Sequence, residues 1–527
     1  MKKYIFTLIF ILVVGLWPFF KSGFFQTHDG EWMIIRFSAF HQTFVSGQIP
    51  VRFVDRLANG FGYTVLNFLY PLPFYISEVF KLLGFGFADS IKITFVFSTI
   101  GSSLAMFWAL KQLFSREASF AGSIIYLFTP YRFVDLYVRG SIGENLAFVF
   151  IPLILGSIYK IKNDKKIFLP LLSLSTAGLI LSHNVIAFIF LPILFIITLL
   201  IIGKKFEIFA NYLLGIFIAA FFWIPALYDL RYVQFSQSAI SDASEHLVSI
   251  SKLIIPSWGY GPNPNGSAGL SVQVGLISLF VITAVLLKRV WQKSKNFIID
   301  FMILLFFASS FMMTSYSKLV WTSTYIEKLI QFPWRLLSVI VFSTAFLTAY
   351  LIDLNKKKLL ISAVIIIGSL ATTLIYTKPA SFVNHPDGYY STNEDSTTVK
   401  DEYLPIWVKV KPQQRANRKL EVLKGDANIG NLNIKSSNYI FTTQIQQESK
   451  FRINTFYYPG WQVISNGQNI KIDKSNVNGL MDFTLPKGKN KVVIKYGETP
   501  VHLVSELMSL VALFSSCIIF VKYLLRQ

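Results

Sequence analysis

The sequence predicts a polytopic α-helical membrane protein that carries a small β domain near its C-terminus. Of the 527 residues, 53% are hydrophobic and 16% are aromatic, and the apolar residues gather in long runs with almost no charge. A helix rises about 1.5 Å per residue, so about 20 apolar residues cross the hydrocarbon core of a bilayer. Between residues 377 and 502, Asn, Lys, Thr and Gly replace Leu and Phe, which predicts a separate domain outside the membrane.

About twelve apolar runs are long enough to be transmembrane helices. They cover residues 4–20, 91–111, 118–134, 142–159, 167–183, 185–203, 206–228, 270–287, 297–315, 334–352, 359–376 and 503–521. The first run follows Lys2 and Lys3 as the core of a signal peptide would, but no small-x-small cleavage pattern comes after it. We therefore expect it to be an uncleaved first span.

The side of the membrane on which each later loop lies depends on whether segment 66–84 crosses. This segment is long enough to cross, but it contains two prolines as well as Glu78 and Lys81. If it stays outside, every short basic loop faces the cytoplasm, as the positive-inside rule requires. These loops are 111–116, 160–166, 204–205, 288–295, 356–358 and 522–526. If the segment crosses, all of them face outward. We therefore expect both termini in the cytoplasm, with the loop 21–90 and the β domain on the outer face.

The chain then divides into a transmembrane domain over 1–376, a β domain over 377–502 and a final transmembrane helix over 503–527. In the outer loop 21–90, Met33, Phe37 and Phe40 recur at helical spacing, which predicts an amphipathic helix at the membrane interface. In the β domain, alternation over 438–445 and 491–496 predicts antiparallel strands. This domain has 17 Lys and Arg against 11 Asp and Glu, a net charge of +6 that favours an anionic lipid or polymer.

The cysteine and histidine content limits the metal chemistry. The single cysteine, Cys517, excludes a disulfide or a thiolate metal site within one chain. The six histidines show no metal-ligand spacing such as His-Glu-x-x-His. A divalent cation could therefore be held only through carboxylates, with Asp29 as the candidate ligand, and no organic cofactor is predicted.

The stretch His-Asp-Gly-Glu at 28–31 follows the first span on the outer face. Asp29 is a candidate catalytic residue, because a carboxylate there can accept a proton from an acceptor hydroxyl or hold a divalent cation. His28 is a second catalytic candidate, and Glu31 and Arg36 are candidates for substrate binding. The alternative is that Asp29 only caps the helix that begins at Gly30.

The second outer loop, 135–145, contains Arg139 and Glu144. An arginine with acidic neighbours suits the binding of a phosphate and the positioning of a hydroxyl. Arg139 is therefore a candidate for substrate binding and Glu144 a catalytic candidate. Two alternatives stay open: Ser141 and Glu144 form a capping box at the start of the next span, and Arg139 extends to the lipid headgroups.

Four further residues are candidates for substrate binding. His183 lies between two closely spaced spans, where it equally fits a tight interfacial turn. Trp258 and Tyr260, in the third outer loop 229–269, can present flat faces to a sugar, although interfacial aromatic belts use the same residues. Arg335 follows Phe-Pro-Trp and can meet a lipid-linked phosphate as a planar fork or anchor the interface.

The order of these motifs resembles the GT-C class of integral-membrane glycosyltransferases and, within it, the YfhO-like bacterial subgroup. The shared plan is an acidic residue soon after the first span, a long outer loop, many spans and an outer C-terminal β domain. The matching motifs extend over nearly the whole chain, at 28–30, 67–73, 137–144, 332–335, 402–405, 457–461 and 485–488.

The resemblance implies transfer of a sugar from a polyprenyl-phosphate carrier to an acceptor at the outer face of the bacterial cytoplasmic membrane, with inversion at the anomeric carbon. The acceptor would be a cell-envelope glycan, lipid or polymer. Membrane lipids would be further partners, and nucleic acid would not. Asp29 would be the base or would orient the acceptor, with Arg139 and Glu144 nearby, and Arg335 would bind the lipid phosphate.

Two other functions stay open at the level of the sequence. The many spans alone allow a lipid-linked glycan flippase or exporter, although the few polar groups within the spans form no path across the membrane. The basic β domain alone allows a non-catalytic envelope protein that binds a polymer.

Overall fold

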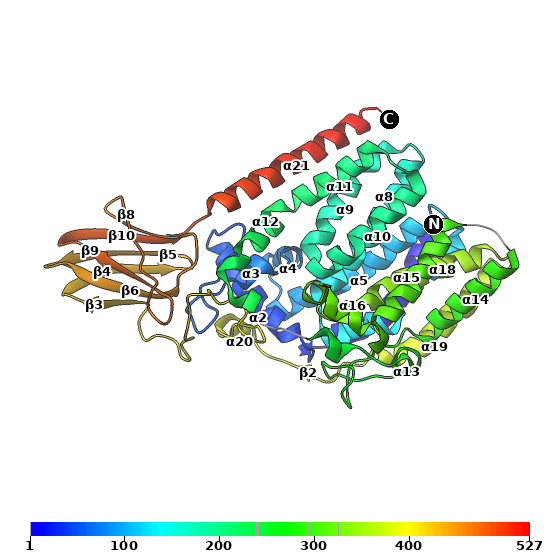
Figure 1. The fold of residues 1–527 in the computed structure, drawn as a ribbon, viewed down its shortest axis with the longest axis horizontal. Helices are drawn as coiled ribbons and strands as arrows, with labels where there is room; N and C mark the ends of the chain where they lie inside the picture. The colour runs from blue at the N-terminus through cyan, green and yellow to red at the C-terminus, as the bar shows by residue number, and fades with distance from the viewer. Residues whose placement is uncertain (1, 238–241, 293–295, 325, 527) are drawn as a thin grey trace.

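The computed structural model describes residues 2–237, 242–292, 296–324 and 326–526. A bundle of long helices forms one end of the molecule and two β sheets form the other (Figure 1). The last helix, α21 (Pro500–Leu524), starts beside the sheets and returns along the bundle. Both termini lie at the end of the bundle remote from the sheets (Figure 1).

Within the described ranges, six helices are long and apolar enough to cross a membrane, which makes the chain a membrane protein. They are α5 (Phe87–Leu110), α8 (Ile142–Lys162), α10 (Asn184–Ile202), α18 (Leu337–Asp353, preceded by the turn Pro333–Leu336), α19 (Lys358–Thr373) and α21. A seventh span is possible if α11 (Phe206–Ile218) and α12 (Ala220–Asp229), which meet at a bend of 62°, cross together.

Other predicted spans correspond to shorter helices, so the number of about twelve stays a prediction. These are α1 (Lys2–Gly15), α9 (Leu169–Ser182), α14 (Leu276–Gln292) and α15 (Phe297–Met312). Two of the basic residues used to orient the spans, Lys293 and Lys295, lie outside the described residues.

The predicted span 118–134 is wrong as a single helix. The chain forms α6 (Arg116–Ile125), a turn, α7 (Pro130–Val134) and a π-helical stretch, Asp135–Arg139. Thr129 is extended, with φ −121° and ψ 146°. Proline disfavours the helical conformation in the residue before it, and it has no N–H to donate, which accounts for the break.

The segment after the first helix folds back on the bundle instead of crossing it. It contains α2 (Gly30–Val45), α3 (Val65–Phe68) and α4 (Leu72–Leu82). At about 1.5 Å per residue, α4 is roughly half as long as a hydrocarbon core of about 30 Å. Segment 66–84 therefore holds no helix long enough to span.

The prediction of an interfacial amphipathic helix is wrong for α2, because the helix is buried on both faces. Phe37 and Phe40 are buried, as expected, but Arg36 and Ser38 on the opposite face are buried as well. The polar face is covered by α20 (Asp387–Thr392) and the chain after it, where the Ser38 hydroxyl donates to the Tyr390 carbonyl at 2.6 Å.

The β sheets are antiparallel and are built from the chain between α19 and α21. One has the strand order β4-β5-β10-β7-β8 and the other β3-β6-β9. The strands are β3 (Leu420–Lys424), β4 (Ala427–Lys435), β5 (Asn438–Ile445), β6 (Ser449–Phe456), β7 (Trp461–Ser465), β8 (Gln468–Ile470), β9 (Leu480–Leu485) and β10 (Gly488–Tyr496). The strands expected at 438–445 and 491–496 are β5 and most of β10.

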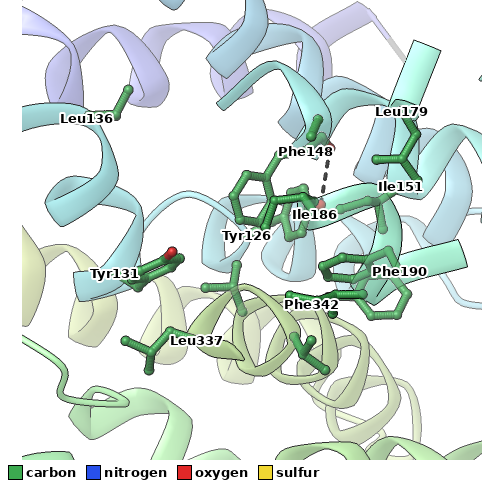
Figure 2. Packing of buried hydrophobic residues seen from close by; sticks show 14 of the residues in the cluster. Tyr126, Tyr131, Leu136, Phe148, Ile151, Leu179, Ile186, Phe190, Leu337 and Phe342 are labelled. Carbon is green, nitrogen blue, oxygen red and sulfur yellow. Dashed lines mark hydrogen bonds between the residues drawn. The ribbon is translucent and has the colours of Figure 1, made fainter. Parts of the chain in front are cut away.

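An aromatic core fills the bundle (Figure 2). The rings of Phe190 in α10 and Phe342 in α18 lie edge to face, with centroids 5.8 Å apart. The Tyr126 hydroxyl donates a hydrogen bond to the Phe148 carbonyl at 3.1 Å, drawn as the dashed line in Figure 2. Tyr131 belongs to the same core, but its hydroxyl donates to a carboxylate of the candidate site.

Arg52 joins the bundle, the β sheets and α21. Its guanidinium is buried and pairs with Glu498 at 3.1 Å and with Glu506 at 2.8 Å. Beside it, His502 of α21 lies 2.9 Å from Asp229 at the end of α12. These contacts fix the start of α21 and the adjoining β10 against the end of the bundle where α2, α3 and α12 meet.

Candidate active site

A backbone clamp holds two distant segments together at this end of the bundle. The N–H groups of His28 and Asp29 donate to the carbonyls of Val138 and Arg139 at 3.0 and 2.9 Å. The close approach requires a glycine at position 140, where φ is +66° and a Cβ would lie 2.3 Å from the Thr27 Oγ1. Asp29 and Arg139 are therefore neighbours in space although 110 residues separate them.

The carboxylate of Asp29 does not cap α2. Asp29 occupies the cap position, but the N–H of Gly30 donates to Thr27 Oγ1 at 2.9 Å and the Asp29 side chain makes no capping bond. The capping alternative is therefore wrong. Within the described ranges the Asp29 carboxylate has no hydrogen bond or ion pair, and it lines a cavity of about 360 Å³.

The cavity lining combines polar and apolar side chains. Its charged residues and its histidine are Asp29, Arg36, Arg139, His183, Lys328 and Arg335. Its apolar residues include Phe68, Leu69, Val185, Ala226, Leu227, Leu230, Phe235 and Leu329. Five of the ten site residues predicted from the sequence therefore line one cavity, although they come from four separate parts of the chain: Asp29 and Arg36 at α2, then Arg139, His183 and Arg335.

Arg139 is held by two buried carboxylates behind the cavity wall. Its Nη1 lies 2.5 Å from Glu144 and 2.9 Å from Asp135, and Trp334 covers its guanidinium at 4.3 Å from the ring centroid. Burial, the largest single effect, lowers the pKa of Arg139, but the neighbouring acidic groups, with Glu144 the strongest, together outweigh burial and raise the pKa above its ordinary value. Arg139 is thus a fixed cation at the cavity.

Glu144 lies behind Arg139 and outside the cavity lining. Besides the ion pair, it accepts a hydrogen bond from the Tyr131 hydroxyl at 2.5 Å. Ser141 makes no capping bond at the start of α8, so the capping-box alternative is wrong. The position of Glu144 suits orienting Arg139 better than contacting a substrate.

Arg335 differs from Arg139 in having no acidic partner among the described residues. Its Nη1 donates to the Ile330 carbonyl at 2.7 Å and to the Gln331 side chain at 3.3 Å. Its Nε is buried and unpartnered in the same described ranges, and the residue is 8% exposed. A buried cation without a counter-ion is costly, and an anion in the cavity would relieve that cost.

His183 presents a neutral imidazole to the cavity. The N–H of Ile186 donates to its Nδ1 at 3.2 Å, so the ring proton lies on Nε2. The ring stacks on Tyr70, with centroids 4.9 Å apart. His183 therefore has an N–H to offer to an oxygen in the cavity.

Two residues of the cavity connect it to the linker between α20 and the β sheets. Arg36 donates from Nε to Thr397 Oγ1 at 2.9 Å. Tyr403 lies between Phe68 and Phe235, stacked on each with centroids 4.9 and 5.6 Å apart. Burial raises the pKa of Tyr403, so its hydroxyl stays protonated. The sequence shows Tyr403 within the motif 402–405 but gives no signal that it reaches this cavity.

The remaining candidates lie outside the cavity lining and connect neighbouring segments. His28 Nε2 lies 2.7 Å from the Tyr260 carbonyl, and the Tyr260 hydroxyl donates to the Lys378 carbonyl at 2.6 Å. Trp258 stacks on Tyr376 at 4.9 Å. Glu31 accepts a hydrogen bond from the Tyr389 hydroxyl at 2.5 Å. The catalytic role expected of His28 and the substrate binding expected of Glu31, Trp258 and Tyr260 stay predictions.

No group of three or more His, Cys, Asp or Glu side chains in the described parts of the chain is arranged to hold a metal ion. Among the described residues that line the cavity, Asp29 is the one carboxylate. A cation at this site would therefore need most of its ligands from a substrate or from water.

Comparisons with known proteins give distant likenesses. No family model matches the chain. An uncharacterized protein of Lactococcus lactis subsp. cremoris (strain MG1363) is 25% identical over 251 residues, which are 44% of this chain and 41% of that protein. The chain therefore matches less than half the length of that relative.

Two solved structures show distant similarity to this chain. The arabinofuranosyltransferase AftD from Mycobacteria has a TM-score of 0.49 at 12% identity, over 74% of this chain and 28% of AftD. The oligosaccharyltransferase of Archaeoglobus fulgidus has a TM-score of 0.41 at 11% identity, over 75% of this chain and 57% of that one. At these values neither likeness establishes a family or an activity.

Proposed function

We propose that this protein is a membrane glycosyltransferase of the GT-C type. It transfers a sugar from a polyprenyl-phosphate carrier to an extracytoplasmic acceptor, which is an envelope glycan, lipid or polymer. One observation carries the proposal. In the described part of the chain, the Asp29 carboxylate has no partner, and it lines the same cavity as Arg335, a cation without an acidic partner there.

The mixed lining of the cavity suits an amphiphilic anion. Arg335 and Arg139 supply positive charge for a phosphate, while Leu227 and Leu230 supply apolar surface. Leu227 is 64% exposed on α12, where a bilayer would surround it. A polyprenyl phosphate combines an anionic headgroup with an apolar chain, so its headgroup can meet the arginines while its chain follows α12.

The chemistry follows from the available groups. The acceptor hydroxyl loses its proton to Asp29 and its oxygen attacks the anomeric carbon from the face opposite the phosphate. The bond between that carbon and the phosphate oxygen breaks, and the bonding electrons leave with the phosphate. Arg335 and the Nε2–H of His183 stabilise the departing charge. Attack from the opposite face inverts the anomeric centre.

The charge of the loops supports an outer location for this reaction. The basic loops 160–166, 204–205 and 356–358 connect helices at the end of the bundle away from the β sheets. The positive-inside rule places that end in the cytoplasm. The cavity, at the opposite end beside α2 and α12, would then face outward, where the β domain also lies.

The test is transfer of a radiolabelled sugar from a panel of polyprenyl-phosphate sugars by the purified protein. Loss of the general base in Asp29→Asn is expected to lower turnover by about 10²–10⁴-fold. Glu31→Gln is the matched control, because it changes a neighbouring carboxylate outside the cavity lining and should leave most of the activity. Equal activity of wild type and Asp29→Asn would contradict the role of Asp29.

An inactive wild type would contradict the transferase itself. Export of a labelled lipid-linked glycan from vesicles would then be measured. Transport that survives Asp29→Asn would support the flippase or exporter instead.

A further inference from the structure

A second hollow, of about 790 Å³, lies on the β sheets and shares no lining residue with the cavity of the candidate active site. It is formed where β8 and the turn after it face the end of β9 and the start of β6. Its lining residues are Trp407, Lys450, Asn469, Ile470, Lys471, Ile472, Asp473, Lys474, Ser475, Phe483 and Thr484. We call it the β-sheet groove.

An aromatic pair and one lysine define the centre of the β-sheet groove. Trp407 donates from Nε1 to the Tyr457 carbonyl at 2.7 Å, which fixes the two rings together. The Lys474 ammonium lies 3.8 Å from the Trp407 centroid and 4.4 Å from the Tyr457 centroid. Such a contact favours the cation and holds the flexible side chain in place.

Lys474 has no carboxylate partner in the described ranges, and partial burial lowers its pKa. A partly desolvated ammonium without a counter-ion gains more from an added anion than a fully hydrated surface lysine does. Lys471, which is exposed and unpaired in the same ranges, lies on the same rim and adds a second positive charge.

The other polar groups of the β-sheet groove suit hydroxyls. Asp473 accepts from the Ser475 hydroxyl at 2.6 Å and pairs with Lys450 at 3.3 Å. The hydrogen bonds from Ser475 hold the pKa of Asp473 down, to about 2, so it stays an acceptor. Asn469 is exposed beside it and offers both a donor and an acceptor.

We propose that the β-sheet groove binds an anionic glycan, a sugar polymer that carries carboxylate or phosphate groups. Lys474 and Lys471 meet the anionic groups, Asp473 and Asn469 meet the hydroxyls, and the Trp407 edge contacts the apolar face of a sugar ring. This inference is independent of the proposed transferase, because it rests on a different set of residues.

The test uses the full-length protein in detergent and binding measured by calorimetry. The probes are an oligogalacturonate, which carries carboxylates, a poly(glycerol phosphate) chain, which carries phosphates, and a neutral maltooligosaccharide of similar length. Lys474→Met keeps an unbranched side chain over the two rings and removes the charge. Lys435→Met makes the same change on β4, at the opposite edge of its sheet from β8.

We expect wild type to bind at least one anionic probe and not the neutral one. The anionic probe that binds shows whether the groove prefers carboxylate or phosphate groups. Lys474→Met should weaken that binding by about tenfold, the loss expected for one charged hydrogen bond, while Lys435→Met leaves it unchanged. Absence of binding to both anionic probes, equal binding of the neutral probe, or equal loss in both variants would overturn the proposal.

Discussion

At the scale of single residues, the two arginines of the cavity have different surroundings and therefore different expected tasks. Arg139 is paired with Glu144 and Asp135, so its charge is already compensated inside the protein. Arg335 has only neutral hydrogen-bond partners in the described part of the chain. An incoming anion consequently gains more from Arg335 than from Arg139.

Arg335→Gln should weaken binding of the donor without unfolding the protein. Removing one charged hydrogen bond costs about 1.5–3 kcal/mol, which corresponds to about a tenfold or larger rise in KM for the lipid-linked donor. Steady-state kinetics with varied donor would measure it. Arg335→Lys keeps the charge but loses the planar fork, so it should restore only part of the affinity. An unchanged KM in Arg335→Gln would assign the phosphate to another residue.

Arg139→Gln should act on stability instead. It leaves two buried carboxylates without their counter-ion, and breaking a buried ion pair in this way costs about 3–5 kcal/mol. The thermal unfolding of the detergent-solubilised protein should shift to lower temperature. The double variant Arg139→Gln with Glu144→Gln should recover part of the loss, since one of the unpaired charges is gone. A fully stable Arg139→Gln would contradict this account of the buried cluster.

At the scale of elements, the site depends on a clamp between the start of α2 and the loop before α8. The clamp has two backbone hydrogen bonds and needs Gly140 in a left-handed conformation. This explains how a carboxylate at 29 comes to lie beside an arginine at 139. It also explains why helix capping is supplied by Thr27, which leaves the Asp29 carboxylate to the cavity.

Gly140→Ala should loosen the clamp and lower activity. The left-handed backbone costs a non-glycine residue about 1–3 kcal/mol, and the new Cβ would also meet Thr27 Oγ1 at 2.3 Å. Gly84→Ala is the control, because Gly84 also has a positive φ but has open space around its Cβ position. Thermal unfolding and sugar transfer should both fall further in Gly140→Ala. Equal effects in the two variants would show that the clash with Thr27 is unimportant.

Helix α2 shows where hydrophobic periodicity led to a wrong prediction. Met33, Phe37 and Phe40 give α2 an apolar stripe, and an interfacial helix was the natural expectation. The structure covers the opposite face of α2 with residues 387–397, more than 340 positions later in the chain. Local periodicity carries no information about a covering segment so distant in the chain. The sequence therefore could not predict that Arg36 is buried or that Tyr403 lines the cavity.

At the scale of the whole molecule, the sequence predicts the polar residues of the site better than it predicts the number of spans. Asp29, Arg139 and Arg335 were selected because polar residues gather at one end of the apolar runs, and they do meet at one cavity. Apolar runs alone did not separate spanning helices from short ones such as α6 and α15. The apolar residues of the cavity lining could not be predicted either, because a leucine that lines a site has the same sequence pattern as a leucine within a span.

The orientation of the molecule in the membrane determines which side the cavity faces, and therefore which lipid-linked donor it can bind. In a variant with Cys517→Ser, a cysteine at Gln468 in β8 should react with a membrane-impermeant maleimide in intact cells. A cysteine at Lys357, in the basic loop before α19, should react only after the cells are permeabilised. Both positions are exposed, so both should react in detergent, which is the control. The positive-inside rule gives this order of reactivity. The reverse order would place the β sheets and Asp29 in the cytoplasm, and the proposed transfer at the outer face would then be wrong.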